Sequence, residues 1–262
     1  MSSNDLKMEP IFESKMFHFS RFKESRINQL ANKICQAYND PKYVDIVMGG
    51  RSRLANDKPY FYNEGNLSKP QNQLYRVFNE ESIVRQFLTL MVELFPLSSE
   101  KERIELVLKK GVFDVNGALK QSSIINRIRR LLFKTKFRIF FRPKYFLHFD
   151  FSSATNGYYR EPHLDGENRM LAGLIYFNFP SIESAKGGEL GIYEPKFSSN
   201  KRQLLESECD LIELITPTEG DCICFLNDNT AYHGVPKMDG FPENEKRYFC
   251  YFGISTEMIK NI

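Results

Sequence analysis

The stretch LIELITPTEGDCICFLNDNTAYHGVP, residues 211–236, carries the pattern that decides the fold class. Short runs rich in Ile, Phe, Tyr and Leu alternate here with turn-forming residues, among them Glu219-Gly220-Asp221. Runs of this kind at this spacing are typical of an all-β sandwich or barrel. The stretch therefore predicts strands at 211–216, 221–226 and 231–236.

The same pattern continues on both sides, from about residue 136 to the end of the chain. It predicts five more strands, at 137–151 with a break at Pro143, 158–165, 170–178, 189–193 and 247–255. Eight such segments can close a jelly roll, that is, a cupin-like double-stranded β-helix. Polar residues between 193 and 211 predict a long exposed loop between two of these strands.

Residues 1–135 have a different pattern, in which apolar residues recur at helical spacing. Helices are expected over 27–38 after a candidate cap at Ser20, and over 71–95, 98–110 and 118–133, with short strands at 42–48 and 59–62. The predicted fold class is α+β with a mainly β core. Residues 1–135 form a mostly helical region that packs against a double-stranded β-helix over 136–262, and we expect one structural unit.

The composition is that of an ordinary globular protein. Of 262 residues 42% are hydrophobic and 26% are charged, which excludes collagen-like, wholly disordered and membrane-spanning classes. The net charge of +3 does not indicate a nucleic-acid or membrane partner. Five cysteines without CxxC spacing favour reduced thiols, and the first residues show no targeting pattern. We expect a cytoplasmic protein, whose oligomeric state the sequence leaves open.

The four histidines, His18, His148, His163 and His233, are the candidate metal ligands. His163 and Asp165 are two residues apart on a predicted strand, so their side chains are expected on one face. His233, on a late strand, is the natural third ligand. Two imidazoles and one carboxylate on a triangular face suit non-haem Fe(II) and leave coordination positions open. Taken alone, His163 and Asp165 are also compatible with an ordinary hydrogen-bonded pair.

The other two histidines have simpler interpretations. His148 and Asp150 are expected to share one face of a strand as a structural pair, and His18 has no carboxylate nearby in the sequence, which favours a packing or surface role.

The order of motifs along the second half of the chain resembles a known family. The motifs are His163-Leu164-Asp165, Arg169 at the start of a strand, Gly187-Gly188, Gly220-Asp221, His233-Gly234-Val235 and Arg247-Tyr248-Phe249. From about Tyr145 onward this order resembles the 2-oxoglutarate- and Fe(II)-dependent oxygenase superfamily, particularly its prolyl-hydroxylase-like branch.

The resemblance implies a role for each matching residue. His163, Asp165 and His233 match the catalytic iron ligands, and Arg247 matches the basic residue that binds the distal carboxylate of 2-oxoglutarate, a role that a guanidinium suits. Tyr176 matches a tyrosine that reaches the same carboxylate in some members. An insertion over 238–244 leaves Lys246 as a competing anchor.

The implied activity is a hydroxylation that uses Fe(II), 2-oxoglutarate and O2 and converts 2-oxoglutarate into succinate and CO2. The acceptor is either a small molecule or a peptide, for example a prolyl residue. Asp165 argues against halogenation, because halogenating relatives have a small residue there. The alternatives are a cupin-like metal-binding or structural protein without oxygenase activity, and a metal-dependent isomerase or hydrolase.

Nine basic residues lie between Lys120 and Lys144, and no acidic residue occurs over 115–149. This segment is either a solvated helix face and strand edge or a platform for an anionic substrate. Arg142 and Arg160 are candidate substrate contacts, because both lie near the predicted metal end of the barrel.

Overall fold

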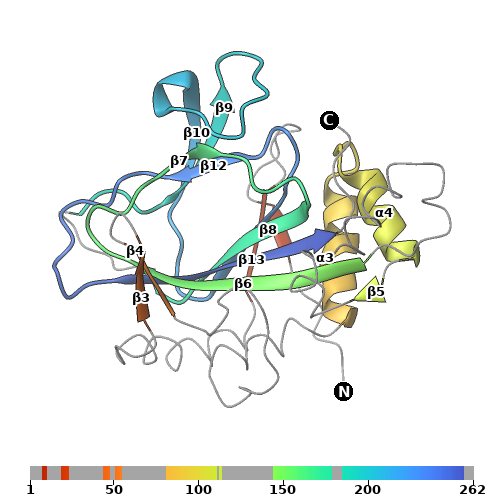
Figure 1. Ribbon diagram of the computed structural model, residues 1–262, viewed down its shortest axis with the longest axis horizontal. Helices are drawn as coiled ribbons and strands as arrows, with labels where there is room; N and C mark the ends of the chain where they lie inside the picture. Colours follow the sequence, from red (N-terminus) through yellow and green to blue (C-terminus); the bar gives the residue numbers. More distant parts are fainter. Residues whose placement is uncertain are drawn as a thin grey trace, which may run out of the picture.

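In the computed structural model of the protein, two sheets face one another and two helices lie at one end (Figure 1). The structure describes residues 8–10, 19–23, 44–47, 51–54, 81–110, 112–113, 144–178 and 185–256. Within these ranges the larger sheet has the order β1-β2-β11-β8-β13-β6-β4-β3, with β5 beside β6, and the smaller sheet has the order β10-β9-β12-β7. Apart from β5 with β6, the pairs are antiparallel.

The strands of the larger sheet are β1 (Met8–Pro10), β2 (Phe19–Lys23), β3 (Val44–Val47), β4 (Arg51–Leu54), β5 (Val112–Phe113), β6 (Lys144–Ala154), β8 (Arg169–Tyr176), β11 (Asp221–Leu226) and β13 (Arg247–Thr256). Those of the smaller sheet are β7 (Arg160–His163), β9 (Leu190–Pro195), β10 (Cys209–Ile215) and β12 (Tyr232–Val235), and a short 3-10 helix, η5 (Glu206–Glu208), precedes β10. The eight strands predicted from residue 137 onward correspond to β6 through β13. This arrangement is a jelly-roll-like core of two antiparallel sheets.

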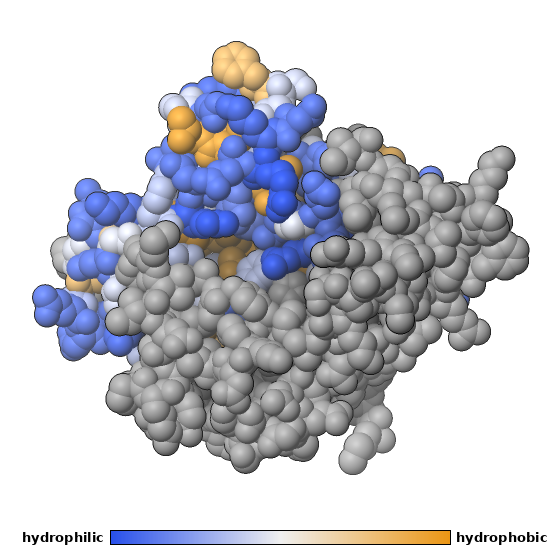
Figure 2. Space-filling view, in the orientation of Figure 1, coloured by the Kyte–Doolittle hydropathy of each residue, from blue (hydrophilic) through white to orange (hydrophobic). Residues whose placement is uncertain are grey.

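The hydrophobic core lies between the two sheets. Every residue of β11 is buried, because this strand is central in its sheet and covered on both faces. Ile223 and Phe225 from β11 pack in one cluster with Ile192 of the smaller sheet and with Tyr176. Outside the core, the described part of the face in Figure 2 is mostly hydrophilic, with a few hydrophobic residues between the polar ones.

Among the described residues the α-helices are α3 (Glu81–Leu94) and α4 (Lys101–Lys110), and they pack against one another. Val84, Leu88 and Met91 of α3 are buried at spacings of four and three residues, as expected for one face of a helix. These helices fall within the predicted ranges 71–95 and 98–110. None of the described helices is long and apolar enough to cross a membrane.

The N-terminal half contributes strands that the sequence pattern did not indicate. Ser20 lies within β2 and pairs with Cys224 of β11, so it is not a helix cap as predicted. The backbone of Ser20 belongs to a sheet ladder that is formed with a strand two hundred residues away (224 minus 20 is 204). The predicted strand at 42–48 contains β3. The predictions for 27–38, 59–62 and 118–133 lie outside the described residues.

Two glycines with positive φ allow a direct test of local packing. Gly187 has φ +79°, and a Cβ there would lie 1.9 Å from the Lys237 carbonyl oxygen, whereas at Gly157, with φ +84°, a Cβ would meet nothing within 4 Å. We expect Gly157→Ala to reduce the free energy of unfolding by about 1–2 kcal/mol, the cost of the left-handed backbone. Gly187→Ala adds overpacking and should cost at least about 3 kcal/mol. Chemical denaturation measures both, and equal losses would contradict the described packing at Gly187.

Candidate active site

Two histidines and one aspartate converge between the two sheets. His163 at the end of β7 is directly paired with His233 of β12, and the centroids of their rings are 4.4 Å apart. Asp165 Oδ2 lies 3.9 Å from His233 Nε2. One ligand atom from each of the three residues lies within 4.8 Å of the other two. The three side chains are therefore close enough to bind a single metal ion.

Backbone carbonyls orient both imidazole rings. His163 Nδ1 lies 2.8 Å from the Glu161 carbonyl oxygen, and His233 Nδ1 lies 3.0 Å from the Ala231 carbonyl oxygen. A carbonyl accepts a hydrogen bond, so both Nδ1 atoms carry hydrogen and both Nε2 atoms keep a lone pair. Burial lowers the pKa of His163 to about 3, and the neighbouring His233 adds to this shift. Neutral imidazoles with a lone pair on Nε2 are the form that binds a metal.

Asp165 reaches the site from a loop and not, as predicted, from a strand. β7 ends at His163, and the Asp165 backbone N–H donates to the Asn227 side chain at 3.1 Å instead of joining the ladder. Its carboxylate is held by two side chains of the larger sheet. Tyr251 Oη donates to Oδ2 at 2.8 Å, and Arg169 Nη1 donates to Oδ1 at 3.3 Å.

Tyr251 and Arg169 are residues that the sequence reasoning did not place at the site. The sequence pattern indicates Arg169 only as the start of a strand. The guanidinium carbon of Arg169 lies 4.5 Å from the centroid of the Tyr251 ring. Tyr251 alternates with Arg247 and Phe249 along β13, so strand alternation places these three on one face. This alternation was the available signal, but it does not show that the hydroxyl reaches Asp165.

We expect Tyr251→Phe to weaken metal binding by about 10- to 100-fold, because the variant removes the hydrogen bond that orients Asp165. Titration of the full-length protein with Mn(II), followed by electron paramagnetic resonance, measures this affinity. Tyr232→Phe is the matched control, since it removes a buried hydroxyl that donates to the Lys201 carbonyl oxygen at 2.5 Å. Equal metal affinity in wild type and Tyr251→Phe would show that the hydrogen bond does not position Asp165.

Arg247 lies in the interior of the jelly roll. Its side chain is fully buried at the start of β13, and its guanidinium carbon lies 4.7 Å from the Phe249 ring centroid, 5.5 Å from that of Tyr158 and 5.6 Å from that of Tyr176. None of its three guanidinium nitrogens has a hydrogen-bond partner among the described residues. Lys246, the competing anchor, is half-buried and precedes the strand. A buried cation without partners is costly, so this position is suited to an anionic ligand.

Tyr176, at the end of β8, also lies at this end of the interior. Its side chain is fully buried, and its hydroxyl has no hydrogen-bond partner among the described residues. Burial raises the pKa of Tyr176 to about 12, although the positive charge of Arg247 opposes this shift. The hydroxyl is therefore protonated and can donate a hydrogen bond to an anion that Arg247 binds.

Residues 238–244, the predicted insertion, pass close to Arg247. Met238 is fully buried, and a Cβ at Gly188 would lie 3.0 Å from Met238 Cγ and 3.7 Å from Arg247 Nη1. Met238 and Arg247 therefore lie side by side over this glycine. Asn156 fixes this segment in place. Its side-chain amide donates to the Phe241 carbonyl oxygen and accepts from the Phe241 backbone N–H.

The remaining candidate residues are Arg160, Arg142, His18 and His148. Arg160 of β7 is exposed, and its Nε lies 3.4 Å from His163 Nε2, so it is beside the candidate metal ligands. Arg142 and His18 lie outside the described residues, as does most of the basic segment over 120–144. For His148 the structure gives the backbone position, within β6.

The hydrophobic core extends from His233 to the rings around Arg247. Phe225 packs on His233 with ring centroids 4.5 Å apart, and it shares one hydrophobic cluster with Tyr158, Tyr176 and Phe249, the rings that surround Arg247. The cluster of candidate metal ligands and the buried guanidinium therefore lie along the same interior, which is enclosed by the two sheets.

Residues 142–252 match the family model of the 2OG-Fe(II) oxygenase superfamily. No curated protein matches the sequence. Among solved structures, a prolyl-4-hydroxylase from Pseudomonas putida is similar, with TM-score 0.45 and 12% identity over 91% of this chain and 93% of that chain.

Two further solved structures are similar at 10% identity. One is a prolyl hydroxylase from Trichoplax adhaerens in complex with a hypoxia inducible factor oxygen degradation domain peptide, with TM-score 0.45 over 97% of this chain and 84% of that chain. The other is HygX from Streptomyces hygroscopicus with nickel and 2-oxoglutarate bound, with TM-score 0.46 over 92% and 83%.

The matched segment contains the His163, Asp165 and His233 cluster as well as Tyr176 and Arg247. Residues 142–252, the β core of this chain, thus match the 2OG-Fe(II) oxygenase superfamily, the family that the order of motifs predicted.

Proposed function

We propose that this protein hydroxylates its substrate with Fe(II) and 2-oxoglutarate, and that His163, Asp165 and His233 are the iron ligands. The observation that carries the proposal is the pairing of this cluster with the buried guanidinium of Arg247, which has no hydrogen-bond partner among the described residues. A structural protein has no need for a fully buried cation without a partner. A dicarboxylate that chelates iron at one end would neutralise it at the other.

The residues present fit both groups. Two neutral imidazoles and one carboxylate suit ferrous iron and leave positions open for a chelating cosubstrate and O2. The planar guanidinium of Arg247 presents several donors to the distal carboxylate of 2-oxoglutarate, and the Tyr176 hydroxyl adds one more. Iron bound here supplies the oxidation chemistry, in which 2-oxoglutarate is converted to succinate and CO2 while the substrate gains a hydroxyl oxygen.

The residues of the chain have the following parts in this reaction. Glu161 and Ala231 keep the histidine rings in the metal-binding tautomer through their carbonyl oxygens. Tyr251 and Arg169 hold the Asp165 carboxylate. The apolar cluster between the sheets excludes bulk water from the oxidising site.

The finer classification follows the same motif order. The motifs resemble the prolyl-hydroxylase-like branch of the superfamily. The acceptor of the hydroxyl group is then a peptide or a small molecule. A cytoplasmic location stays a prediction, which the four free cysteines among the described residues support.

The competing function is a cupin-like protein that binds metal or none and has no oxygenase activity. Anaerobic addition of Fe(II) and 2-oxoglutarate to the purified protein separates the two. The oxygenase is expected to give the weak visible charge-transfer band of the chelate, and then to consume O2 and form succinate in step with 2-oxoglutarate. Absence of the band together with O2 consumption that is independent of 2-oxoglutarate would favour the cupin-like alternative.

A further inference from the structure

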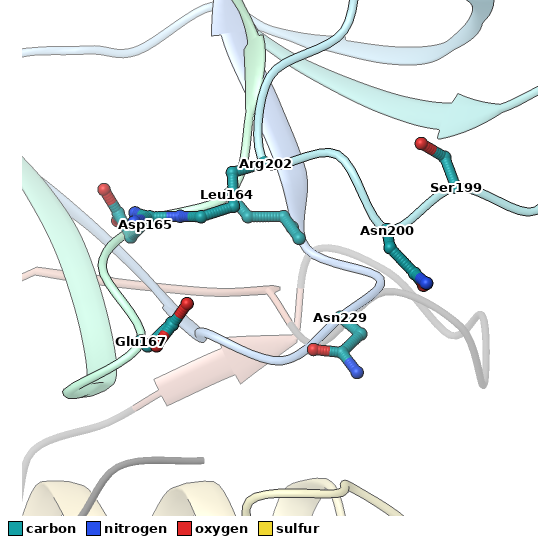
Figure 3. A pocket seen from close by; sticks show the side chains of 7 residues that line it. All are labelled: Leu164, Asp165, Glu167, Ser199, Asn200, Arg202 and Asn229. Carbon is teal, nitrogen blue, oxygen red and sulfur yellow. The ribbon is translucent and has the colours of Figure 1, made fainter. Parts of the chain in front are cut away.

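A small polar pocket opens beside the proposed iron ligand Asp165 (Figure 3). Its volume is about 100 Å³. Three loops line it: residues 164–167 between β7 and β8, residues 199–202 between β9 and β10, and Asn229 between β11 and β12. Since a cavity of about 150 Å³ holds a benzene molecule, this pocket accepts a group of a few heavy atoms.

The walls of the pocket are fixed by hydrogen bonds. The Leu164 backbone N–H donates to the Arg202 carbonyl oxygen at 2.8 Å, which joins two of the loops. Asn227, which follows β11, joins the third loop to the first. Its side chain accepts from the Asp165 N–H and donates to the Gly166 carbonyl oxygen at 2.8 Å. Arg103 of α4 donates to the Glu167 carbonyl oxygen at 3.2 Å. The pocket is therefore formed before any ligand binds.

The side chains that line the pocket are mostly charged or polar. Glu167 and Arg202 provide opposite charges, and within the described part of the chain neither side chain forms an ion pair or hydrogen bond, with each other or with another residue. The adjacent Lys201 differs, because it forms an ion pair with Glu208 at 2.6 Å. Figure 3 shows Glu167 and Arg202 on the same side as Asp165, with Asn200 and Asn229 opposite. Leu164 is the single apolar lining residue.

We infer that this pocket binds a zwitterionic end of the substrate, so that the substrate is a small molecule with an ammonium and a carboxylate, of which a free α-amino acid is the simplest. This inference rests on the proposed function. The guanidinium of Arg202 pairs with the carboxylate and Glu167 pairs with the ammonium. The two asparagine amides supply neutral donors and acceptors. Because Asp165 lines the same pocket, the rest of the substrate extends toward the metal centre.

A peptide interior fits these observations less well. Its backbone carries no paired charges, so it would leave Glu167 and Arg202 without partners. The volume of about 100 Å³ also matches a single polar group better than a segment of chain. The observations therefore favour the small-molecule class over the peptide class of acceptor.

The test uses the full-length protein loaded with Mn(II) and 2-oxoglutarate. The probes are the common free α-amino acids, their N-acetyl derivatives and their amides, and binding is measured by Mn(II)-dependent broadening of the probe proton signals. At least one free amino acid should bind. Arg202→Gln and Glu167→Gln should each weaken that binding at least about tenfold, as expected for loss of a charge-assisted pair. Lys201→Gln is the matched control and should leave it unchanged.

The derivatives assign each charge. The N-acetyl derivative lacks the ammonium, so it should bind weakly, and Glu167→Gln should not lower its affinity further. The amide lacks the carboxylate, so it should also bind weakly, and Arg202→Gln should not lower its affinity further. The inference is overturned if no free amino acid binds to protein that holds Mn(II) and 2-oxoglutarate, or if Lys201→Gln weakens binding as much as Arg202→Gln does. Paramagnetic resonance and 2-oxoglutarate titration of the same samples show whether the cofactors bind. Protein that binds neither would overturn the proposed function, and this inference with it.

Discussion

Arg247→Met is expected to weaken binding of 2-oxoglutarate by at least about 30-fold and to leave the folded protein at least as stable as the wild type. Both effects follow from a guanidinium that is fully buried and has no hydrogen-bond partner among the described residues. In the absence of ligand this charge is destabilising, and its removal should raise the free energy of unfolding by about 1–3 kcal/mol, less what is lost in contacts with the surrounding rings. Methionine keeps a similar apolar volume.

When 2-oxoglutarate is bound, the charge of Arg247 is instead expected to stabilise the complex. Loss of one partner of a buried charge pair costs about 2–5 kcal/mol, which is at least about a 30-fold loss of affinity for 2-oxoglutarate. Isothermal titration of the Mn(II)-loaded protein measures the affinity, and urea denaturation of the metal-free protein measures the stability.

Arg247→Lys is the control for charge alone. It keeps the positive charge but loses the planar fork, so we expect an affinity between those of the wild type and Arg247→Met. If Arg247→Met binds 2-oxoglutarate as the wild type does, the distal carboxylate is held elsewhere, and Lys246 becomes the next residue to test. If the metal-free variant is strongly destabilised, the guanidinium has a structural role instead.

His163→Ala and Asp165→Ala are each expected to lower metal affinity by about 100-fold or more. Each removes one of three ligands that lie within 4.8 Å of one another, whereas changes to residues that only orient ligands cost about 10- to 100-fold. The affinity for Mn(II) is measured by paramagnetic resonance, and the charge-transfer band with Fe(II) and 2-oxoglutarate should disappear in parallel. Asp165→Asn separates charge from shape, since its amide still accepts hydrogen bonds through one oxygen.

The control for a histidine substitution is His148→Ala. The sequence assigns His148 to a structural pair with Asp150, so this variant should keep the metal affinity of the wild type even if its stability falls. A loss of metal binding as large as that of His163→Ala would contradict the assignment of the three ligands. Unchanged metal affinity in both His163→Ala and Asp165→Ala would refute the metal centre itself.

The strands of the second half were predictable because their signals are local. β11, for instance, has the predicted bounds 221–226, because a turn sequence precedes it. Each of its residues is buried in the structure. β2 was not predicted, because its strand conformation depends on pairing with β11, far away in the sequence. Asp165 was placed on a strand by alternation, but its backbone N–H binds the Asn227 side chain and leaves the ladder.

The sequence by itself determined the run of strands, the family resemblance and the choice of candidate ligands, because strand patterns, turn residues and motif order are properties of neighbouring positions. Only the tertiary structure decided that His233 lies opposite His163, that Tyr251 donates to Asp165, and that Arg247 is surrounded by rings and without a hydrogen-bond partner within the described ranges. These features depend on the register between strands and on the packing of the two sheets. Register and packing are set by contacts between distant residues, and a local pattern does not contain them.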